Sequence, residues 1–458
     1  MSGDPPPPDV RRQALIDLLR EATGQAVPTT TFGRFRRLAG AAASAAWASR
    51  RGSSEATGIG AMDPADIERL VVSLGELKGI AMKMGQILSY IDVKLPPETQ
   101  RLLALLQSWS QPTAFETIAT TLREELGAEA EAILATLDPA PVASASIGQV
   151  HRARRPDGEA VAVKVRHPGI DEAIRADFRA ASLGKAMSGL LFPGSNVKEA
   201  IDEARTRFLE ECDYRLEASR QRRFSRLCAG HPLIDVPAVH DAWSAARVLT
   251  TTWHAGVGLE AFLAGGASEA ERTARGLGLY DFYVGTLYRH GVFNADPHPG
   301  NLVFQPDGRL AILDYGCVRE FEPDTVAALG ALSRAVRDDD AGRMRDALVE
   351  LGAHDPGAGK RFETTRGLLR GFYGPVLEAG ARQVEAGASL AMGDAFRTKR
   401  AIFRLRLPGK LLFLFRIRFG LYAVLARLGA VADWRAVESA LTEPGLSSPP
   451  SPPCALQG

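Results

Sequence analysis

The sequence has few cysteines, no long uncharged apolar run and almost no net charge, and each of these absences argues against a class of protein. Its 458 residues include four cysteines, at positions 212, 228, 317 and 454, without Cys-x-x-Cys spacing or a histidine cluster. This pattern argues against a structural metal site and favours a reducing compartment. A net charge of +1 and an aromatic content of 7% give no indication of a nucleic-acid-binding surface.

No stretch reaches the roughly 18 uncharged apolar residues that a membrane-spanning helix needs. The richest candidate, residues 411–428, is interrupted by Arg416, Arg418 and Arg427. Its apolar residues share one helical face, and these are Leu412, Phe415, Phe419 and Tyr422. We expect this helix to pack into the core of a C-terminal lobe; the alternative is a basic, apolar surface that docks on anionic lipid.

An alanine-rich segment from Leu38 to Ser49 is flanked by arginines, but it begins too far along the chain for a usual signal peptide. The expected location is therefore the cytoplasm, with a peripheral position at the membrane as the alternative. The proline run Pro5 to Pro8 and the Ser/Pro-rich residues 445–458 predict poorly structured termini. With 45% hydrophobic residues, the chain is long enough for two or three cores.

Two carboxylates and an amide lie between residues 296 and 316 at the spacing of a phosphoryl-transfer site. The segment reads Asp296-Pro-His-Pro-Gly-Asn301 and then Asp314-Tyr315-Gly316. In the protein-kinase pattern an Asp meets the nucleophile, an Asn five positions later holds one Mg²⁺, and a later Asp-Phe-Gly supplies the second metal ligand. Asp296 is therefore the candidate catalytic residue, and Asn301 and Asp314 are the candidate Mg²⁺ ligands.

The residues between these motifs predict a β-hairpin. Leu302 to Phe304 and Arg309 to Leu313 are short apolar runs on either side of the turn Pro306-Asp307-Gly308. A hairpin brings Asn301 and Asp314 to the same end of a ribbon, where both oxygens can reach a Mg²⁺ bound to nucleotide phosphates. The alternative is two solvated loop carboxylates beside an ordinary hairpin.

An altered phosphate loop precedes this cluster in the expected order. Residues 143–150 overlay the Gly-x-Gly-x-x-Gly-x-Val loop, with alanine in the first two glycine positions. The added Cβ atoms limit how closely backbone N–H groups can approach phosphate oxygens. We therefore expect nucleotide binding that is weaker than, or selective in a different way from, that of a glycine loop.

A lysine follows on a predicted strand over Val161 to Val165, after the turn Arg155-Pro156-Asp157-Gly158. Lys164 matches the lysine of the Val-Ala-Ile-Lys strand, whose ammonium is satisfied by phosphate oxygens and a helix glutamate. On its own, Lys164 reads as an ordinary edge-strand lysine; its place between the loop and the later Asp pair makes it a candidate catalytic residue. Val248 to Thr252 is predicted as the last strand of an N-terminal lobe, and Gly256 after it suits a hinge.

One helix is expected from about Ser195 to Phe224, and it carries the candidate glutamate partners of Lys164. Glu211 and Glu217 lie six residues apart, so both cannot meet Lys164 directly from one helix. The sequence leaves open which of them does. The alternative reading of this segment is a solvated acidic face.

These motifs together resemble the UbiB family of atypical kinases, also called the AarF or ADCK group. Three further segments carry the resemblance, namely Lys83-Met84-Gly85-Gln86, Leu95-Pro96-Pro97-Glu98 and Glu211-Cys212-Asp213. The resemblance runs from about residue 60 to residue 430. It implies an α+β, bilobal protein-kinase-like fold with a small β-rich N-lobe and a helical C-lobe. A helical N-terminal extension carrying the Lys-x-Gly-Gln motif is expected to fold over the active site.

The implied organisation has five segments. They are a basic N-terminal segment (1–60), the helical extension (61–137), an N-lobe with inserted helices (138–256), a C-lobe (257–444) and a disordered tail (445–458). ATP and Mg²⁺ are the implied cofactors. The implied nucleotide-binding residues are Lys83, Gln86, Ala143, Ser144, Ala145, Ser146, Ile147, Gly148, Val150, Lys164, Glu211, Asp213 and Glu217.

One departure from the family concerns Asn294, which occupies a position where many members have histidine. An amide can hydrogen-bond to the backbone but cannot titrate, so a proton-shuttle role at Asn294 is not expected.

Three functions fit these observations. The favoured one is an ATP-binding UbiB-type kinase or ATPase that supports quinone or other isoprenoid-lipid metabolism. The implied partners are a nucleotide, an isoprenoid-lipid or quinone intermediate, a membrane surface and a biosynthetic enzyme complex. A Ser/Thr protein kinase is disfavoured by the altered loop, the Lys-x-Gly-Gln segment and the lack of Ala-Pro-Glu after Asp314. A pseudokinase scaffold that binds nucleotide is disfavoured by the presence of Lys164 and Asp296.

Overall fold

The computed structural model describes residues 113–144, 147–172, 175, 209–353, 359–385 and 409–443. The chain forms two compact units. Unit 1 comprises residues 1–158, 162–213 and 245–249, and unit 2 comprises residues 159–161, 214–244 and 250–458. The predicted boundary between the N-lobe (138–256) and the C-lobe (257–444) lies elsewhere, because residues 214–244 belong to unit 2. The five expected segments therefore stay a prediction.

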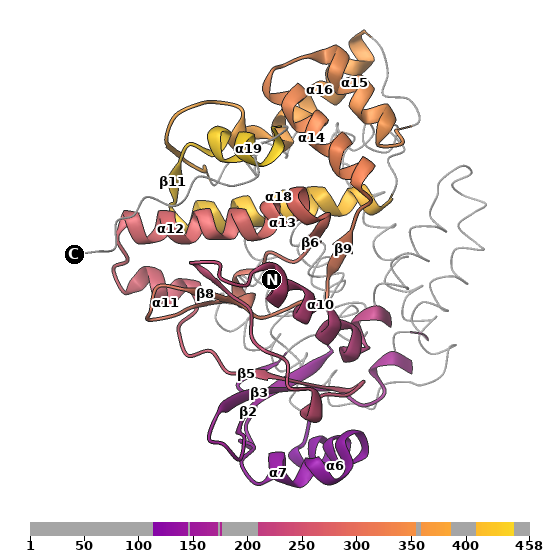
Figure 1. The fold of residues 1–458 in the computed structure, drawn as a ribbon, viewed down its shortest axis with the longest axis vertical. Coiled ribbons are helices and arrows are strands. Elements are labelled where there is room, and N and C mark those ends of the chain that lie inside the picture. Colours follow the sequence, from indigo (N-terminus) through magenta and orange to yellow (C-terminus); the bar gives the residue numbers. More distant parts are fainter. Residues whose placement is uncertain are drawn as a thin grey trace, which may run out of the picture. The chain divides into compact units, whose positions relative to one another are not determined.

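Four strands form one sheet in the order β1-β2-β3-β5 (Figure 1). They are β1 (Ala143–Ser144), β2 (Gly148–Arg154), β3 (Ala160–Arg166) and β5 (Val248–Thr252). The strands predicted around Lys164 and over residues 248–252 are thus confirmed. The turn between β2 and β3 is closed by a hydrogen bond of 2.8 Å from the Gly158 N–H to the Arg155 carbonyl. Gly158 has a φ of +89°, which glycine adopts without steric cost.

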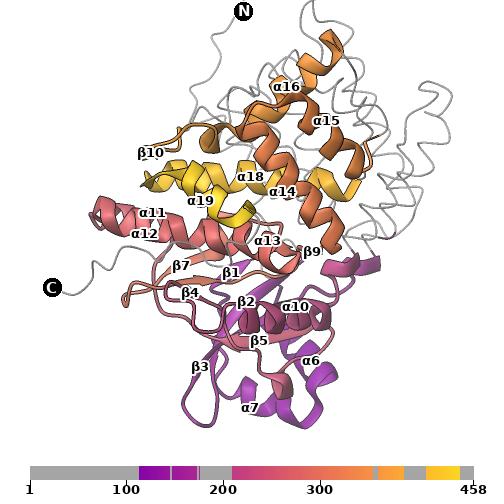
Figure 2. The same cartoon turned by 45° about the horizontal axis from the view of Figure 1, so that its top comes forward.

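Two helices of unit 1 pack against each other and are joined by the short 3₁₀ segment η2, and the second of them contacts β2 (Figures 1 and 2). They are α6 (Phe115–Leu126) and α7 (Ala130–Leu134), with η2 at Gly127–Glu129. Ile118 and Leu122 are fully buried on the inner face of α6. The carboxylate of Glu125 accepts hydrogen bonds from the backbone N–H of Arg247 (2.9 Å) and from its Nε (2.8 Å). These bonds tie the end of α6 to the chain that leads into β5.

Helices dominate unit 2, and α12, η4 and α13 follow one another along a single path beside α18 (Figures 1 and 2). The segment η4 is π-helical (Asp281–Gly285). The α-helices are α10 (Tyr214–Leu227), α11 (Leu259–Ala264), α12 (Glu269–Tyr280), α13 (Thr286–His290), α14 (Pro323–Arg337), α15 (Ala341–Glu350), α16 (Lys360–Phe372), α18 (Gly409–Leu428) and α19 (Trp434–Thr442). The 3₁₀ turns are η3 (Asp241–Trp243), η5 (Pro299–Asn301) and η6 (Gly374–Val376).

Short strands connect these helices in three small sheets, ordered β4-β8-β7, β6-β9 and β10-β11. The strands are β4 (Ile234–Asp235), β6 (Val292–Asn294), β7 (Leu302–Phe304), β8 (Leu310–Ile312), β9 (Val318–Glu320), β10 (Arg382–Gln383) and β11 (Val431–Ala432). The hairpin predicted between Asn301 and Asp314 is confirmed as the antiparallel pair β7 and β8. The expectation that the chain after residue 256 is mostly helical apart from this hairpin is confirmed for the described residues, although β6–β9 and β10–β11 also form short strand pairs.

The single helix expected from about Ser195 to Phe224 is also wrong where the structure describes it. Residues 209–211 are helical, and the chain then turns at Cys212 and Asp213 before α10 begins at Tyr214. The turn is held by hydrogen bonds from the Cys212 N–H to the Leu209 carbonyl and from the Asp213 N–H to the Glu210 carbonyl. These i to i+3 bonds end the helix. Glu211 and Glu217 therefore lie on different elements.

Helix α18 contributes to the core of unit 2, as predicted for the described part of this helix. Leu421, Val424 and Leu425 are buried, and the Phe419 ring stacks edge-on against Phe372 at 5.6 Å. Arg418 is also buried, which excludes it from a basic surface for lipid. The side chains of residues 409–417 lie outside the described set. Among the described residues, no helix is long and apolar enough to cross a membrane.

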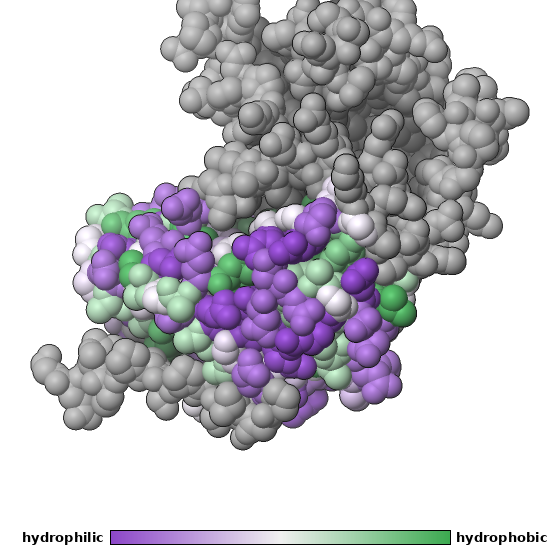
Figure 3. Space-filling view, turned by 90° about the horizontal axis from the view of Figure 1, so that it is seen from above, coloured by the Kyte–Doolittle hydropathy of each residue, from purple (hydrophilic) through white to green (hydrophobic). Residues whose placement is uncertain are grey.

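The described surface carries few large apolar side chains. The face shown in Figure 3 is mostly hydrophilic, and its hydrophobic residues form small separate groups. The exposed large hydrophobic residues among those described are Val142, Val257, Leu313 and Val349.

Candidate functional site

The hairpin β7–β8 places Asn301 and Asp314 at the same end, as the sequence predicts. Leu302 pairs with Ile312, and the ladder continues through a hydrogen bond of 2.9 Å from the Leu313 N–H to the Asn301 carbonyl. Asn301 therefore immediately precedes β7, and Asp314 follows shortly after β8, at the same end of the hairpin. Both are half-buried.

A second strand pair brings Asp296 to the same segment. Strands β6 and β9 pair Asn294 with Val318, and the Ala295 N–H donates to the Cys317 carbonyl at 2.7 Å. Asp296 follows directly on one side of this pair, and Gly316 precedes it on the other. The strand pair β6–β9 thus joins the two ends of the segment that contains Asp296, Asn301 and Asp314, and the hairpin β7–β8 lies within this segment.

Asn294 joins the two halves of this segment. Its side-chain Nδ2 donates to the Asp314 carbonyl at 2.6 Å, and its Oδ1 accepts from the Asp296 N–H at 3.0 Å. The side chain is fully buried, so both bonds are shielded from water. The expectation that an amide at this position hydrogen-bonds to the backbone is confirmed, and the bonds fix Asp296 relative to Asp314.

Two of the three candidate side chains are hydrogen-bonded to each other, and the third is bonded to the backbone of its own motif. Asn301 Nδ2 donates to Asp296 Oδ2 at 3.2 Å. Because this nitrogen faces Asp296, the amide oxygen of Asn301 is directed away from that carboxylate. Asp314 Oδ1 accepts the Gly316 N–H at 2.8 Å, which holds the carboxylate close to its own backbone.

The donor set fits Mg²⁺ bound together with nucleotide phosphates. Mg²⁺ takes oxygen ligands, and proteins usually bind it through one or two carboxylates plus phosphate oxygens and water. Asp314 supplies a carboxylate and Asn301 an amide oxygen. Among the described residues there is no group of three or more His, Cys, Asp or Glu side chains that could hold a metal by themselves. The arrangement thus suits a metal that is shared with a substrate.

Tyr315 occupies the aromatic position of the Asp-Tyr-Gly motif and is fully buried. Its ring lies 5.3 Å from that of Phe224 on α10 and 6.4 Å from that of Phe282. Burial raises the pKa of the Tyr315 hydroxyl well above 10.0, and nearby thiol and carboxylate groups add to this shift. Tyr315 is therefore neutral, and its ring anchors the motif in the core as a phenylalanine would.

Helix α10 also holds the glycine of this motif, a contact that the sequence did not predict. Arg220 Nη1 donates to the Gly316 carbonyl at 2.8 Å. Arg220 lies three residues after Glu217, one turn along the same helix, and Glu217 is buried. The sequence gives no local signal for this contact, because Arg220 and Gly316 are far apart along the chain.

In unit 1, Lys164 lies on β3 between residues that face the core. Val163 and Val165 are fully buried, whereas Lys164 is on the opposite face and half-buried. Arg166, two residues further, donates from Nη1 to the Cys212 carbonyl. This bond places the Glu211-Cys212-Asp213 segment beside the strand that carries Lys164. Glu211 is half-buried and Asp213 is exposed.

The alanine-rich loop joins two antiparallel strands. Ala143 pairs with Val150, and Ser144 pairs with Gln149. Ile147 is buried and Gly148 begins β2. Ala145 and Ser146 at the loop tip, and Lys83 and Gln86 of the Lys-x-Gly-Gln motif, lie outside the described residues.

Gln149, next to this loop, makes contacts that sequence reasoning missed. Its Oε1 accepts the Thr113 N–H at 2.7 Å, and its Nε2 donates to the Thr113 carbonyl at 3.2 Å. The same Nε2 lies 2.8 Å from His151 Nε2, and both side chains are fully buried. Gln149 thus joins β2 to the chain that enters α6.

The chain is similar to a known family and to curated proteins. A family model described as ABC1 atypical kinase-like domain matches residues 105–348. Protein ACTIVITY OF BC1 COMPLEX KINASE 3, chloroplastic, from Arabidopsis thaliana is 35% identical over 293 residues, which are 61% of this chain and 40% of that protein. Atypical kinase COQ8, mitochondrial, from Saccharomyces cerevisiae is 29% identical over 269 residues, which are 58% of this chain and 53% of that protein.

A solved structure is similar over a larger share of both chains. It is the complex of Rv3197 with erythromycin from Mycobacterium tuberculosis, which is 30% identical with a TM-score of 0.59 and covers 83% of this chain and 96% of that chain. The matches to the two curated relatives, by contrast, span only about half of their length or less. The predicted α+β, kinase-like fold is confirmed by the family match and by this structure.

Proposed function

The chain belongs to the ABC1 atypical kinase-like family, the UbiB group that its motifs resemble, and from this we propose that it is an Mg²⁺-dependent ATP-binding phosphotransferase or ATPase. The observation that supports this best is the convergence of Asp296, Asn301 and Asp314 on one segment of unit 2. A carboxylate near the nucleophile and two oxygen ligands for a metal are what phosphoryl transfer requires.

Each residue has a separate role in this proposal. Asn301 and Asp314 hold Mg²⁺, which supplies charge neutralisation at the phosphates. Asp296 orients the attacking oxygen and accepts its proton. Most of the rate gain then comes from positioning and charge stabilisation, since the protein forms no covalent bond to the phosphate.

For unit 1 we propose residues that bind the nucleotide. Lys164 binds the α- and β-phosphates, and the alanine-rich loop from Ala143 to Val150 covers them. Lys83, Gln86, Glu211, Asp213 and Glu217 complete the nucleotide site by resemblance to the family. Because Glu211 and Glu217 lie on different elements, comparing ADP binding by Glu211→Gln and Glu217→Gln identifies the partner of Lys164.

ATP hydrolysis tests the proposal. We expect turnover with Mg²⁺ and none with excess chelator, because the proposed reaction requires the metal ion that Asn301 and Asp314 hold. Liposomes with and without anionic lipid, added in parallel, test for an acceptor or activator at a membrane surface. A peptide phosphorylation screen on the same preparation tests the Ser/Thr kinase alternative. Mg²⁺-dependent nucleotide binding without turnover in any arm would leave a scaffold as the function, and absence of that binding would overturn the proposal.

We propose a role in quinone or isoprenoid-lipid metabolism on the basis of family analogy. Quinone profiling of a deletion strain tests this role, and unaltered quinone pools would contradict it. Erythromycin belongs in the binding assay as a second ligand, because the similar Mycobacterium tuberculosis structure is a complex with it.

A further inference from the structure

A glycine of α18 lies against the catalytic loop. A Cβ added to Gly420 would stand 2.7 Å from Pro297 Cγ and 3.3 Å from the Pro297 carbonyl oxygen, and a separation below 3.0 Å forces one side to move. Gly420 lies within a helix, where alanine is more favourable than glycine. The close approach to Pro297 therefore explains why this position has no side chain.

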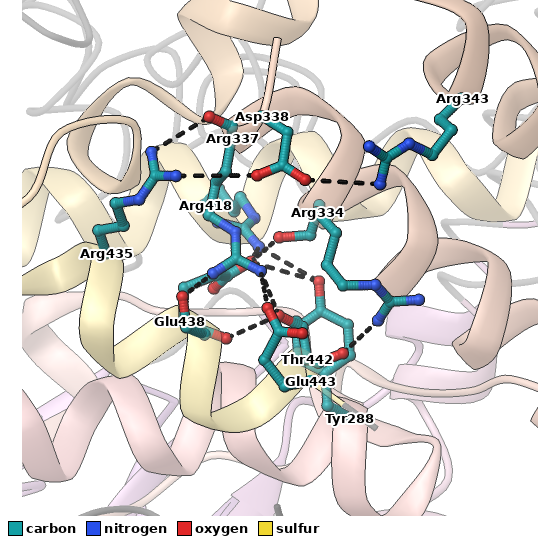
Figure 4. Close-up of polar contacts among 12 residues, drawn as sticks. Tyr288, Arg334, Arg337, Asp338, Arg343, Arg418, Arg435, Glu438, Thr442 and Glu443 are labelled. Carbon is teal, nitrogen blue, oxygen red and sulfur yellow. Dashed lines mark hydrogen bonds and ion pairs between the residues drawn. The ribbon is translucent and has the colours of Figure 1, made fainter. Parts of the chain in front are cut away.

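Helix α18 is held firmly two residues before this contact. Arg418 is buried and pairs with Glu438 of α19 (Figure 4). Its Nη1 donates to the Tyr422 hydroxyl at 2.9 Å, and its guanidinium lies 4.2 Å from the centre of the Tyr373 ring. A buried charge with this many partners leaves the helix little freedom to shift.

The other end of this ion pair is fixed by the helices that precede the catalytic loop and follow it. The Tyr280 hydroxyl, at the end of α12, donates to Glu438 Oε2 at 2.5 Å. The Ser333 hydroxyl of α14 donates to Glu438 Oε1 at 2.6 Å. Helix α12 continues through η4 and α13 into β6, which leads to Asp296. The buried pair thus couples α18 to the frame from which the catalytic loop starts.

The backbone of Asp296 is already fixed on both sides within the loop. Its N–H donates to Asn294 Oδ1, and its carbonyl accepts from the His298 N–H at 2.8 Å. Pro297 between Asp296 and His298 is buried, and Gly420 packs against its ring. The contact with Gly420 therefore reaches the loop from α18, outside the hydrogen bonds that the loop makes with itself.

We propose that Gly420 is a positioning residue for Asp296, and that α18, which lies beyond the family match at residues 105–348, sets the position of the catalytic loop through Pro297. This inference rests on the proposed phosphoryl-transfer function. A side chain at position 420 displaces Pro297 rather than α18, because Arg418 anchors the helix. Asp296 then moves away from the attacking oxygen, while the residues that bind nucleotide are unchanged.

The variant Gly420→Ala tests the proposal. We expect kcat for ATP hydrolysis to fall by about 10- to 100-fold, the loss that a misplacement near 1 Å produces, with the Kd of MgADP unchanged. The matched control is Gly367→Ala on α16, a helical glycine with open space around its Cβ position. The control should retain kcat and melt at the same or a higher temperature.

Rescue distinguishes positioning from a general loss of structure. Pro297→Ala removes the ring atoms nearest to position 420, so the double variant with Gly420→Ala should recover part of the kcat lost in Gly420→Ala. If Gly420→Ala does not fold, Pro297→Ala alone serves, with a lower kcat and unchanged MgADP binding expected. Wild-type kcat in Gly420→Ala overturns the inference, and so does a reduced kcat that the double variant does not recover in part. Where only Pro297→Ala folds, wild-type kcat in that variant overturns it. Absence of MgADP binding in the wild-type protein would instead overturn the proposed function.

Discussion

Asp314 and Glu438 are both carboxylates of unit 2 held by hydrogen bonds, but their surroundings differ. Glu438 is fully buried, faces the buried charge of Arg418 and accepts bonds from Tyr280 and Ser333. Asp314 is half-buried at the end of a strand, and its side-chain Oδ1 accepts the N–H of Gly316 in its own motif. The first charge is compensated by protein groups on all sides, whereas the second is placed where solvent and a cation can reach it.

Within unit 2, we therefore expect Glu438 to serve stability and Asp314 to serve the proposed reaction. Burial raises the pKa of Glu438, but the charge of Arg418 and the bonds from Ser333 and Tyr280 outweigh it, so the pKa lies below 4.5. A charge in this setting contributes to the fold only while its partners are present. Removing Glu438 should therefore affect folding, and removing Asp314 should affect turnover.

The largest effect is expected from Asp314→Asn. The variant keeps the shape of the side chain but loses the charge that we propose binds Mg²⁺, so kcat for ATP hydrolysis should fall about a thousandfold, as when a charge-stabilising group is removed. The melting temperature should change little. The control Asp307→Asn alters an exposed residue of the turn in the same hairpin and should retain turnover. Asp314→Asn with wild-type turnover would show that this carboxylate is not a metal ligand.

The second largest effect is expected from Glu438→Gln, on stability instead of turnover. Glu438→Gln leaves the Arg418 charge buried without its counter-ion, and the free energy of unfolding at neutral pH should fall by about 3 kcal/mol, typical for breaking a buried pair. Urea unfolding measures it. Glu443→Gln, which alters a carboxylate with an exposed fraction of 42% beside Arg337, is the matched control and should have a much smaller effect. Equal losses in the two variants would refute the distinction between buried and exposed charge.

Arg220→Met should give a smaller effect, which changes the Mg²⁺ requirement for turnover and leaves the stability of the fold nearly the same. Loss of the hydrogen bond to the Gly316 carbonyl loosens the Asp-Tyr-Gly motif, and a bond to a charged donor is worth about 1.5 kcal/mol, or roughly tenfold in affinity. We therefore expect the Mg²⁺ concentration for half-maximal turnover to rise by about that factor. Arg226→Met changes an exposed arginine of the same helix and should leave the Mg²⁺ requirement as it is.

The smallest effect is the pH dependence of stability. Because the folded pKa of Glu438 is lower than its usual value of 4.5, its stabilisation is fully present above 4.5 and is lost as the pH falls through the folded pKa. Unfolding free energies of the wild type and Glu438→Gln should therefore converge as the pH is lowered below 4.5. A constant gap between the two proteins down to pH 3 would contradict this assignment.

The catalytic hairpin could be predicted because its determinants are local. A Pro-Asp-Gly turn between two apolar runs specifies β7 and β8, and the motif spacing then places Asn301 and Asp314 at one end. Strand β3 was predictable for the same reason, since alternating buried valines surround Lys164.

The remaining features depend on contacts between distant segments. The break after Glu211 arises from backbone bonds at Cys212, which no periodicity of the sequence announces. Arg418 read as an interruption of an apolar helix, because its partner Glu438 lies on the next helix. Gly420 and Pro297 are 123 positions apart, and nothing local to either residue indicates the contact.

The binding of Mn²⁺ in place of Mg²⁺ tests the central claim most directly, because it reports the metal ligands without requiring turnover. Electron paramagnetic resonance of the protein with Mn²⁺ and ADP should show bound metal in the wild type and in Glu443→Gln. The bound signal should be lost in Asp314→Asn and weakened in Asn301→Ala. Full Mn²⁺ binding in both site variants would contradict a metal site at the end of the β7–β8 hairpin.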